Sequence, residues 1–342
     1  SHSGSMAIEE LALQGIADFT LDNSGNQIGL LAAGTSAERI GALTLGNGAA
    51  MEVGTLGSQN GILASGDLDI TSADLTVSQA IDTQSTTNQA NDSANAITID
   101  VSGASNINAG VTAPGDIAFV GTTNITGAKV ESGSAGISIT GSGGTLASGA
   151  KLKTDAGAID LGGNNITVTG SSSAVESNSG AVTVSGDGFT LDDSATLTSD
   201  TGALTFSGDN FTADNGASVE TVSSAIDFTG ASASINGAST VTSDSGAIEF
   251  AGSGASIAGG STVETTSSNI IVSGISAAIE ADIVTNSGDV LVSGGNTVFN
   301  GGTVTTATGD IDVTGSLNMI DDGTLEATAG TIALNAGVIN AS

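Results

Sequence analysis

Carboxylates are the side chains of this sequence that could carry acid–base chemistry or bind a metal ion. The 342 residues include 36 Asp and Glu, 4 Lys and Arg, one His and no Cys. Asp227 and Glu249 lie 22 residues apart, at the same position of two similar segments. A repeat of that length would bring them within the roughly 5–10 Å that glycoside hydrolysis needs between two carboxyl groups. Two carboxylates this close repel, which raises one pKa or draws a cation between them.

Calcium is the metal ion that such side chains favour, because it takes oxygen ligands from carboxylates and backbone carbonyls. The glycine-rich nonapeptide that binds calcium in some repeat proteins is absent. Any calcium site would therefore be sporadic, and no other cofactor is expected. The candidate metal ligands are Asp192, Asp193, Asp227, Glu249, Asp310 and Asp312.

The remaining composition excludes several classes of function. The single His, His2, lies in a segment that resembles an expression tag, so Ser and Thr hydroxyls have no His base and no enzyme is expected. The formal net charge of −32 argues against nucleic acid or an anionic membrane as partner, since both need a basic surface. No stretch approaches the roughly 20 apolar residues of a membrane-spanning helix, so membrane insertion is not expected either.

A 22-residue repeat between Gly180 and Gly274 would position these side chains. Each copy contains a short strand with apolar second and fourth residues, usually a polar third residue, and a closing glycine. The strand segments are Ala181-Val-Thr-Val-Ser-Gly186, Ala203-Leu-Thr-Phe-Ser-Gly208, Ala225-Ile-Asp-Phe-Thr-Gly230, Ala247-Ile-Glu-Phe-Ala-Gly252 and Asn269-Ile-Ile-Val-Ser-Gly274. Two more strand-like pieces occur in each period, and a fixed period with three strands is typical of a solenoid.

The sequence therefore predicts an all-β fold: a right-handed, single-stranded parallel β-helix, a three-sided solenoid of about 14 turns of about 20–23 residues. Apolar ladders should fill its core. Ile226 and Ile248 belong to one ladder that runs to Ile332, and Phe228 and Phe250 belong to its neighbour, which runs to Leu334. Phe206, Phe228 and Phe250 should stack in consecutive turns.

The chain falls into three predicted parts. Residues 1–6 have the composition of an expression-tag remnant, and residues 7–40 are predicted to form an N-terminal cap or an irregular first turn. Within that cap we expect a short helix at Glu9–Gln14 and a strand at Asp18–Leu21. Residues 41–342 form the β-helix, with a polar loop insertion at about 79–93 that is the first candidate for a contact site.

The period, rich in Thr, Ser, Asn, Gly and Asp, resembles the repeat regions of filamentous-haemagglutinin-like and autotransporter-type bacterial surface adhesins. The resemblance covers roughly residues 41–342 and rests on the strand–Gly–strand–strand pattern. It implies a non-enzymatic, secreted β-helical rod on the outer bacterial surface, a segment of a larger fibre. Its implied partner is a protein or glycan on a host or neighbouring cell. The alternative is a β-helical polysaccharide-active enzyme or glycan-binding module.

Overall fold

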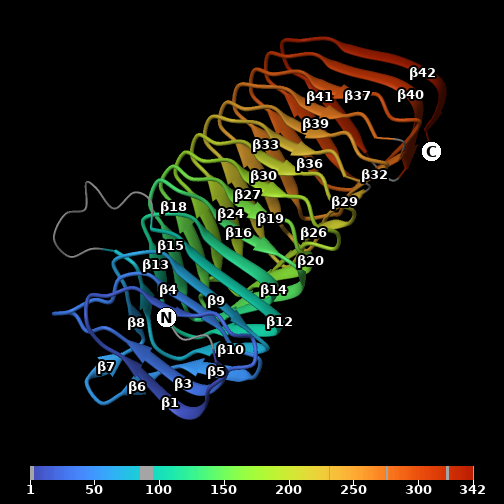
Figure 1. Cartoon of the computed structure of the whole chain (residues 1–342). Coiled ribbons are helices and arrows are strands. Elements are labelled where there is room, and N and C mark those ends of the chain that lie inside the picture. Colours follow the sequence, from blue (N-terminus) through green and yellow to red (C-terminus); the bar gives the residue numbers. More distant parts are fainter. Residues whose placement is uncertain (1–3, 85–94, 231, 275, 321–322, 342) are drawn as a thin grey trace. The chain divides into compact units, whose positions relative to one another are not determined.

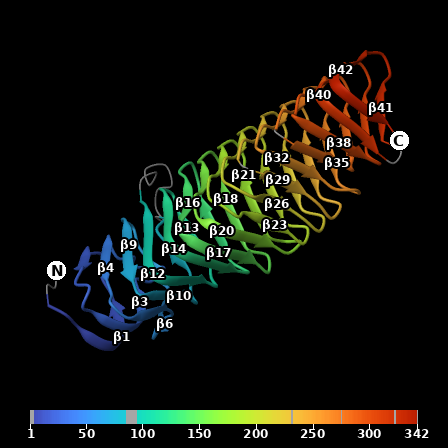
Figure 2. The same cartoon turned by 90° about the vertical axis from the view of Figure 1, so that its right-hand side faces the viewer.

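The computed structural model describes residues 4–84, 95–230, 232–274, 276–320 and 323–341. Every named element in these ranges is a β-strand. The parallel strands stack as a β-solenoid of about 14 turns, so the predicted all-β parallel solenoid is confirmed. The chain divides into two compact units, Ser1–Ile166 (unit 1) and Thr167–Ser342 (unit 2). In both units the strands lie in rows, each strand beside the equivalent strand of the next turn (Figures 1 and 2).

Unit 2 has three rows of short strands, which we call its first, second and third faces. The first face holds β22 (Val182–Val184), β25 (Leu204–Phe206), β28 (Ile226–Phe228), β31 (Ile248–Phe250), β34 (Ile270–Val272) and β37 (Val290–Val292). The second face holds β23 (Thr190–Asp192), β26 (Phe211–Ala213), β29 (Ser232–Ile235), β32 (Gly254–Ile257), β35 (Ser276–Ile279) and β38 (Asn296–Asn300). The third face holds β21 (Ala174–Ser177), β24 (Thr196–Ser199), β27 (Ser218–Thr221), β30 (Thr240–Ser243), β33 (Thr262–Thr265), β36 (Asp282–Thr285), β39 (Thr303–Thr306) and β41 (Thr324–Ala327). Two long strands run through both the first and second faces, β40 (Ile311–Ile320) and β42 (Ile332–Ala341).

Unit 1 has the same three faces with less regular strands. Its first face holds β2 (Phe19–Leu21), β4 (Leu43–Gly46), β9 (Leu68–Ser72), β16 (Ile137–Thr140) and β19 (Ile159–Leu161). Its second face holds β5 (Ala50–Val53), β10 (Asp74–Val77) and β17 (Ser142–Ala147), and β20 (Asn164–Thr169) begins at its end. Its third face holds β8 (Ile62–Leu63), β11 (Ile81–Asp82), β13 (Val111–Ala113), β15 (Lys129–Ser132) and β18 (Lys151–Thr154). Four strands cross from one face to the next: β1 (Ala7–Leu13), β3 (Gln27–Ala33), β12 (Ile97–Ile107) and β14 (Ile117–Thr126). A hairpin of β6 (Thr55–Leu56) and β7 (Gln59–Asn60) is antiparallel.

The core lies where the sequence predicts it. Ile226, Phe228, Ile248 and Phe250 are at most 2% exposed, because alternation along each strand turns them inward while the residues between them face out. The ladder prediction is wrong at its end: Ile332 and Leu334 are 42% and 39% exposed. They belong to β42, which pairs with β40 on one side only among the described strands, so no further turn covers them.

The predicted helix at Glu9–Gln14 is also wrong. Glu9 to Leu13 belong to β1, which pairs in parallel with β3 from Ala7↔Gln27 to Leu13↔Ala33, and Gln14 follows the strand. A six-residue helix is marginal on its own, whereas strand pairing satisfies the backbone along the whole segment. The predicted strand at Asp18–Leu21 is confirmed as β2. Residues 7–40 thus build strands of the solenoid, and Met6 joins them by donating its N–H to Asn26 Oδ1.

The corner after the first face is narrow in both units. Glycine at this corner meets one or both of two constraints, a positive φ and a close approach of the preceding turn. Gly121 has φ of 101°, a conformation that side chains rarely adopt. At Gly230 the cause is proximity, since a Cβ there would overlap the carbonyl oxygen of Gly208 in the preceding turn.

A buried ladder of hydroxyl groups follows the third face of unit 2. Its members are 1–3% exposed and stand three residues before a glycine or serine: Ser177, Ser199, Thr221, Ser243, Thr265, Thr285 and Thr306. Ser199 shows the pattern: its Oγ accepts the N–H of Gly202 at 2.9 Å and donates to the carbonyl of Gly180 at 3.0 Å. Each hydroxyl therefore satisfies backbone groups that the tight corner would otherwise leave buried and unpaired.

Candidate functional site

The outward-facing residues of the first face in unit 2 form a row that contains the predicted carboxylate pair. Strands β28 and β31 pair in parallel with Asp227 opposite Glu249, so the predicted adjacency of the two carboxylates is confirmed. Both side chains are half-buried. Parallel neighbours lie about 4.8 Å apart, a spacing close to that of a retaining glycosidase pair. We call this series, from Thr183 through Asp227 to Ala333, the outer row.

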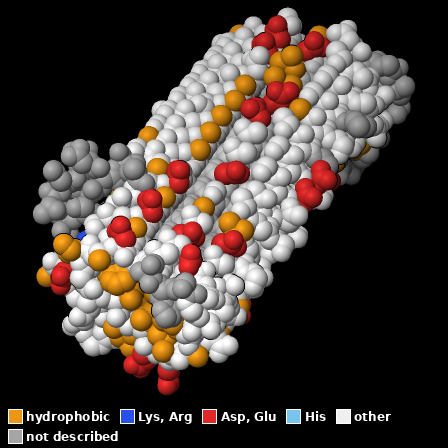
Figure 3. All heavy atoms as spheres, viewed as in Figure 1, with side chains coloured by type: hydrophobic (Ala, Val, Ile, Leu, Met, Phe, Trp, Pro, Cys, Tyr) orange, Lys and Arg blue, Asp and Glu red, His pale blue; other side chains and the backbone are white. Residues whose placement is uncertain are grey.

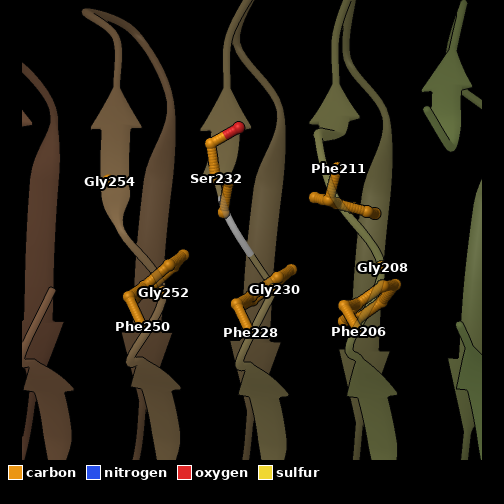
Figure 4. A pocket seen from close by; sticks show the side chains of 10 residues that line it. Phe206, Gly208, Phe211, Phe228, Gly230, Ser232, Phe250, Gly252 and Gly254 are labelled. Carbon is orange, nitrogen blue, oxygen red and sulfur yellow. The ribbon is translucent and has the colours of Figure 1, made fainter. Parts of the chain in front are cut away.

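A stack of phenylalanine rings fixes the backbone beneath this carboxylate pair. The ring centroids of Phe206 and Phe228 lie 4.6 Å apart, and those of Phe228 and Phe250 lie 4.7 Å apart, with nearly parallel planes. Figure 4 shows the three rings on successive turns, with Phe211 from the second face beside Phe206. The predicted stack is confirmed, and it holds Asp227 and Glu249 on strands whose inner faces are fully packed.

Burial changes the acidity of one member of the pair. Desolvation in the half-buried row raises the pKa of Asp227 above its ordinary value, because water solvates the charged form better. Asp227 therefore takes up a proton more readily than a free aspartate does. The nearest groups on its own row are Thr205 on one side and Glu249 on the other.

The outer row continues with two apolar residues that the sequence analysis did not single out. Ile271 lies opposite Glu249, Leu291 lies opposite Ile271, and Asp312 follows Leu291. Both apolar side chains are half-buried, as Asp227 and Glu249 are. The signal was present in the sequence, because the third strand residue is usually polar and Ile271 and Leu291 depart from that rule.

The corner beside this row carries a series of one amide and two carboxylate side chains with a structural role. Asn269 Oδ1 accepts the N–H of Asp289 at 2.8 Å, and Asp289 Oδ1 accepts the N–H of Asp310 at 2.9 Å. Asp310 Oδ1 in turn accepts the N–H and the hydroxyl of Thr331 at 2.7 Å and 2.9 Å. These hydrogen bonds, the backbone one first, lower the pKa of Asp310. Each side chain thus ties its own turn to the next.

The six candidate metal ligands do not come together. Asp227, Glu249 and Asp312 share the outer row, but Ile271 and Leu291 separate Asp312 from the pair. Asp192 lies on the second face, where its Oδ1 accepts the N–H of Asp193 and the Nδ2 of Asn215, both at 2.8 Å. Within the part of the chain that the structure describes, no three Asp, Glu, His or Cys side chains are close enough to hold one metal ion. Figure 3 likewise shows the acidic side chains of the viewed face as separate groups.

The polar insertion predicted at 79–93 is only partly described. Ile81 and Asp82 form β11, which pairs with β8 and β13, so the first residues of this range belong to a turn. Residues 85–94 lie outside the described residues. Beside β11, Arg39 Nη2 contacts Asp82 Oδ2 at 2.8 Å, and Arg39 Nη1 donates to the carbonyls of Ala64 and Asp82 at 2.9 Å each.

Comparison of the chain with protein-family models, with curated proteins and with solved structures found no match. Across the described residues, no helix is long and apolar enough to cross a membrane.

Proposed function

We propose that this chain is a non-enzymatic β-helical rod segment of a large bacterial cell-surface adhesin or fibre. Its place is outside the cell, and its partner is a protein or glycan on a host or neighbouring cell. The observation that carries the proposal is the repetition in unit 2, where first-face strands from β22 to β34 pair with the next turn in one unbroken register. Such a stack extends by adding turns, which is what a spacer on a cell surface needs.

The outer surface supports the same proposal. The sequence of unit 2 contains 20 Asp and Glu and no Lys, Arg or His. Like charges along the surface keep neighbouring copies apart, which favours a fibre that does not stick to itself. Some of these carboxylates tie successive turns together, as Asp289 and Asp310 do, and others lie in the outer row.

Adhesion is tested by applying the fluorescently labelled chain to host epithelial cells and to bacterial cells, and measuring bound label against concentration. The proposal predicts saturable binding that unlabelled chain displaces. Prior treatment of the cells with protease or with glycosidases separates a protein partner from a glycan. Binding that never saturates, on every cell type tried, would overturn the adhesive role.

The alternative, a polysaccharide-active enzyme, has one observation in its favour: Asp227 and Glu249 are neighbours and the pKa of Asp227 is raised. Release of reducing ends from a panel of bacterial and plant polysaccharides tests it. Release that the D227N/E249Q variant abolishes would replace the rod proposal with the enzyme. We expect no release from either protein.

Calcium is tested separately, by thermal unfolding with added calcium and with a chelator. A ligand that binds only the folded state raises the melting temperature. Because no three carboxylates converge among the described residues, we expect equal melting temperatures in the two conditions. A rise of several degrees with calcium would show that carboxylates are organised into sites, and the rod would then be a calcium-stabilised one.

A further inference from the structure

The outer row of unit 2 changes character between Glu249 and Asp312. Before this segment its residues are Thr183, Thr205 and Asp227, which are ordinary outward residues of a solvated strand. Ile271 and Leu291 then place two large, half-buried apolar side chains in adjacent register positions on the outer face, with Glu249 on one side and Asp312 on the other. The first face of unit 1 offers no such pair, since its outward residues are Thr20, Thr44, Asp69, Thr98, Ala118, Ser138 and Asp160.

The carboxylates around Ile271 and Leu291 favour a partner with positive charge. Asp227 and Glu249 precede the pair, Asp312 follows it, and Asp289 lies on the adjoining corner. Because the sequence of unit 2 contains no Lys, Arg or His, these carboxylates have no cation within their own unit to pair with. A cationic partner is therefore attracted to this face and an anionic one is repelled.

The spacing between residues of the outer row favours a helical partner segment over an extended one. Successive residues of the row lie about 4.8 Å apart, the distance between paired strands. Side chains on one side of an α-helix recur every three or four residues, which is about 4.5–6 Å along its axis. Same-side residues of an extended peptide recur about every 6.6–6.8 Å and lose register within three steps. A helix lying along the row can therefore match all five positions from Asp227 to Asp312.

We propose that the outer row of unit 2, from Asp227 to Asp312, docks a cationic amphipathic helix of a partner protein. Leu-type side chains of the helix cover Ile271 and Leu291, and Lys or Arg side chains meet Asp227, Glu249 and Asp312. The proposal rests on the adhesive rod proposed above, to which it adds a contact face and the chemistry of the partner. The contact resembles helix-in-groove recognition, in which an amphipathic helix is bound through its apolar face, but here the helix lies on the face of a sheet.

A designed peptide tests this directly with the whole chain. The probe is a fluorescent, Ala-based helical peptide with Lys at positions 1, 4 and 15 and Leu at positions 8 and 11. Along the helix these positions place Lys opposite Asp227, Glu249 and Asp312, and Leu opposite Ile271 and Leu291. Its affinity is measured by fluorescence anisotropy at physiological salt, beside a peptide of the same composition in scrambled order. We expect saturable binding of the ordered peptide and at least about tenfold weaker binding of the scrambled one.

Three variants of the chain locate the contact. I271T/L291T keeps the charge and installs the residue that the row carries elsewhere, and it should weaken binding by about tenfold or more. D227N/E249Q should weaken binding by about fivefold and reduce its salt dependence. E220Q/E264Q removes two carboxylates from the third face of the same unit and should leave the affinity unchanged.

The results separate this proposal from its premises. If the ordered peptide does not bind, or if E220Q/E264Q weakens binding as much as D227N/E249Q, the docking face is overturned, because general charge attraction then accounts for the data. The cell-binding experiment stands apart. Cell binding that survives in I271T/L291T retains the adhesive rod and removes this face from it. Peptide binding without cell binding retains the docking face and overturns the adhesive rod.

Discussion

First-face strands of unit 2 begin 20 to 22 residues apart, with a constant 22 from Val182 to Ile270, whereas those of unit 1 begin 20 to 29 residues apart. The regular unit repeats its contacts: the hydroxyl ladder and the Phe stack recur from turn to turn. Unit 1 shares the buried hydroxyl ladder at Ser132 and Thr154 and adds contacts made by single side chains. Asn26 and Asn47 are fully or almost fully buried and bond to several backbone groups, and Arg39 ties β8 and β11 together.

When successive turns have the same length, the same side-chain contact can form in each of them. When the turn length varies, the corners of successive turns no longer coincide. Longer side chains such as Asn26, Asn47 and Arg39 then hydrogen-bond to the backbone groups that the corners leave unpaired. All four basic residues of the chain lie in unit 1, where Arg39 pairs with Asp82 and Lys129 pairs with Glu131. The following predictions test this division between repeated and individual contacts, beginning with the largest expected effect.

Phe228→Ala should lower the free energy of unfolding most, by about 3–5 kcal/mol, because it empties a buried site and removes three ring contacts at once. Urea unfolding followed by circular dichroism measures the change. Phe228→Leu retains most of the volume and should cost clearly less. If both variants lose less than about 1 kcal/mol, the repeated stack does not stabilise the regular unit.

Arg39→Ala should lower the free energy of unfolding by about 1.5–3 kcal/mol, since it leaves the half-buried Asp82 without its charged partner and removes the hydrogen bonds from Arg39 to two carbonyls. Arg39→Lys keeps the charge but cannot reproduce the fork that reaches both carbonyls and the carboxylate. We therefore expect a loss for Lys that is smaller than for Ala but still measurable. A silent Lys variant would show that charge alone holds this part of unit 1.

Gly246→Ala should cost about 1–3 kcal/mol, because the added Cβ overlaps the carbonyl oxygen of Ser224 one turn earlier. Ser224 itself occupies the equivalent corner and carries a Cβ, with Gly202 before it and Gly246 after it. Serine replaces glycine at this corner in two turns, at Ser224 and Ser268. Ser224→Ala, the matched control, should be neutral in the same urea titration. Equal stability of all three proteins would show that the corner relaxes freely.

Ser243→Ala should cost about 1–2 kcal/mol, because its Oγ accepts the N–H of Gly246 at 2.8 Å and donates to the carbonyl of Ser224 at 3.2 Å. Ser243→Thr should retain full stability, since Thr221 and Thr265 fill the same position in the adjacent turns. Hydrogen exchange of the Gly246 amide gives a local reading. Unchanged protection in the Ala variant would count against the hydroxyl ladder.

The smallest effects concern pH. The pKa of Asp227 is raised by burial, so its contribution to stability is present below its unfolded pKa and is lost as pH rises through the folded pKa. Asp227→Asn should therefore gain stability relative to the parent between about pH 4 and 7. The pKa of Asp310 is lowered by its bonds to Thr331, so its contribution is present at neutral pH and is lost as pH falls through the folded pKa.

Asp310→Ala should accordingly lose stability at pH 7 and approach the parent below about pH 4. Thermal unfolding of the parent and both variants across this range shows whether the two differences have opposite slopes. Slopes of the same sign would mean that the direction of the pKa shift is wrong for either Asp227 or Asp310. Asp310→Asn is the control, because Asn269 makes the same backbone hydrogen bond without a charge.

The sequence by itself determined the repeated part of the fold. Residues one period apart become neighbours, so Ile226 and Ile248, Phe228 and Phe250, and Asp227 and Glu249 could all be paired from their spacing. The same reasoning needs no knowledge of side-chain contacts, because backbone pairing between identical positions sets the register. This is why the core ladders and the adjacency of one carboxylate pair were predictable.

The tertiary structure alone decided what depends on the turns above and below. It placed Glu9 to Leu13 in a strand, because β3 pairs with them, and it left Ile332 and Leu334 exposed, because no described turn covers them. It separated Asp192 from the outer row and placed Ile271 and Leu291 between Glu249 and Asp312. Burial and hydrogen bonding at one position are properties of three consecutive turns, and a single repeat does not contain them.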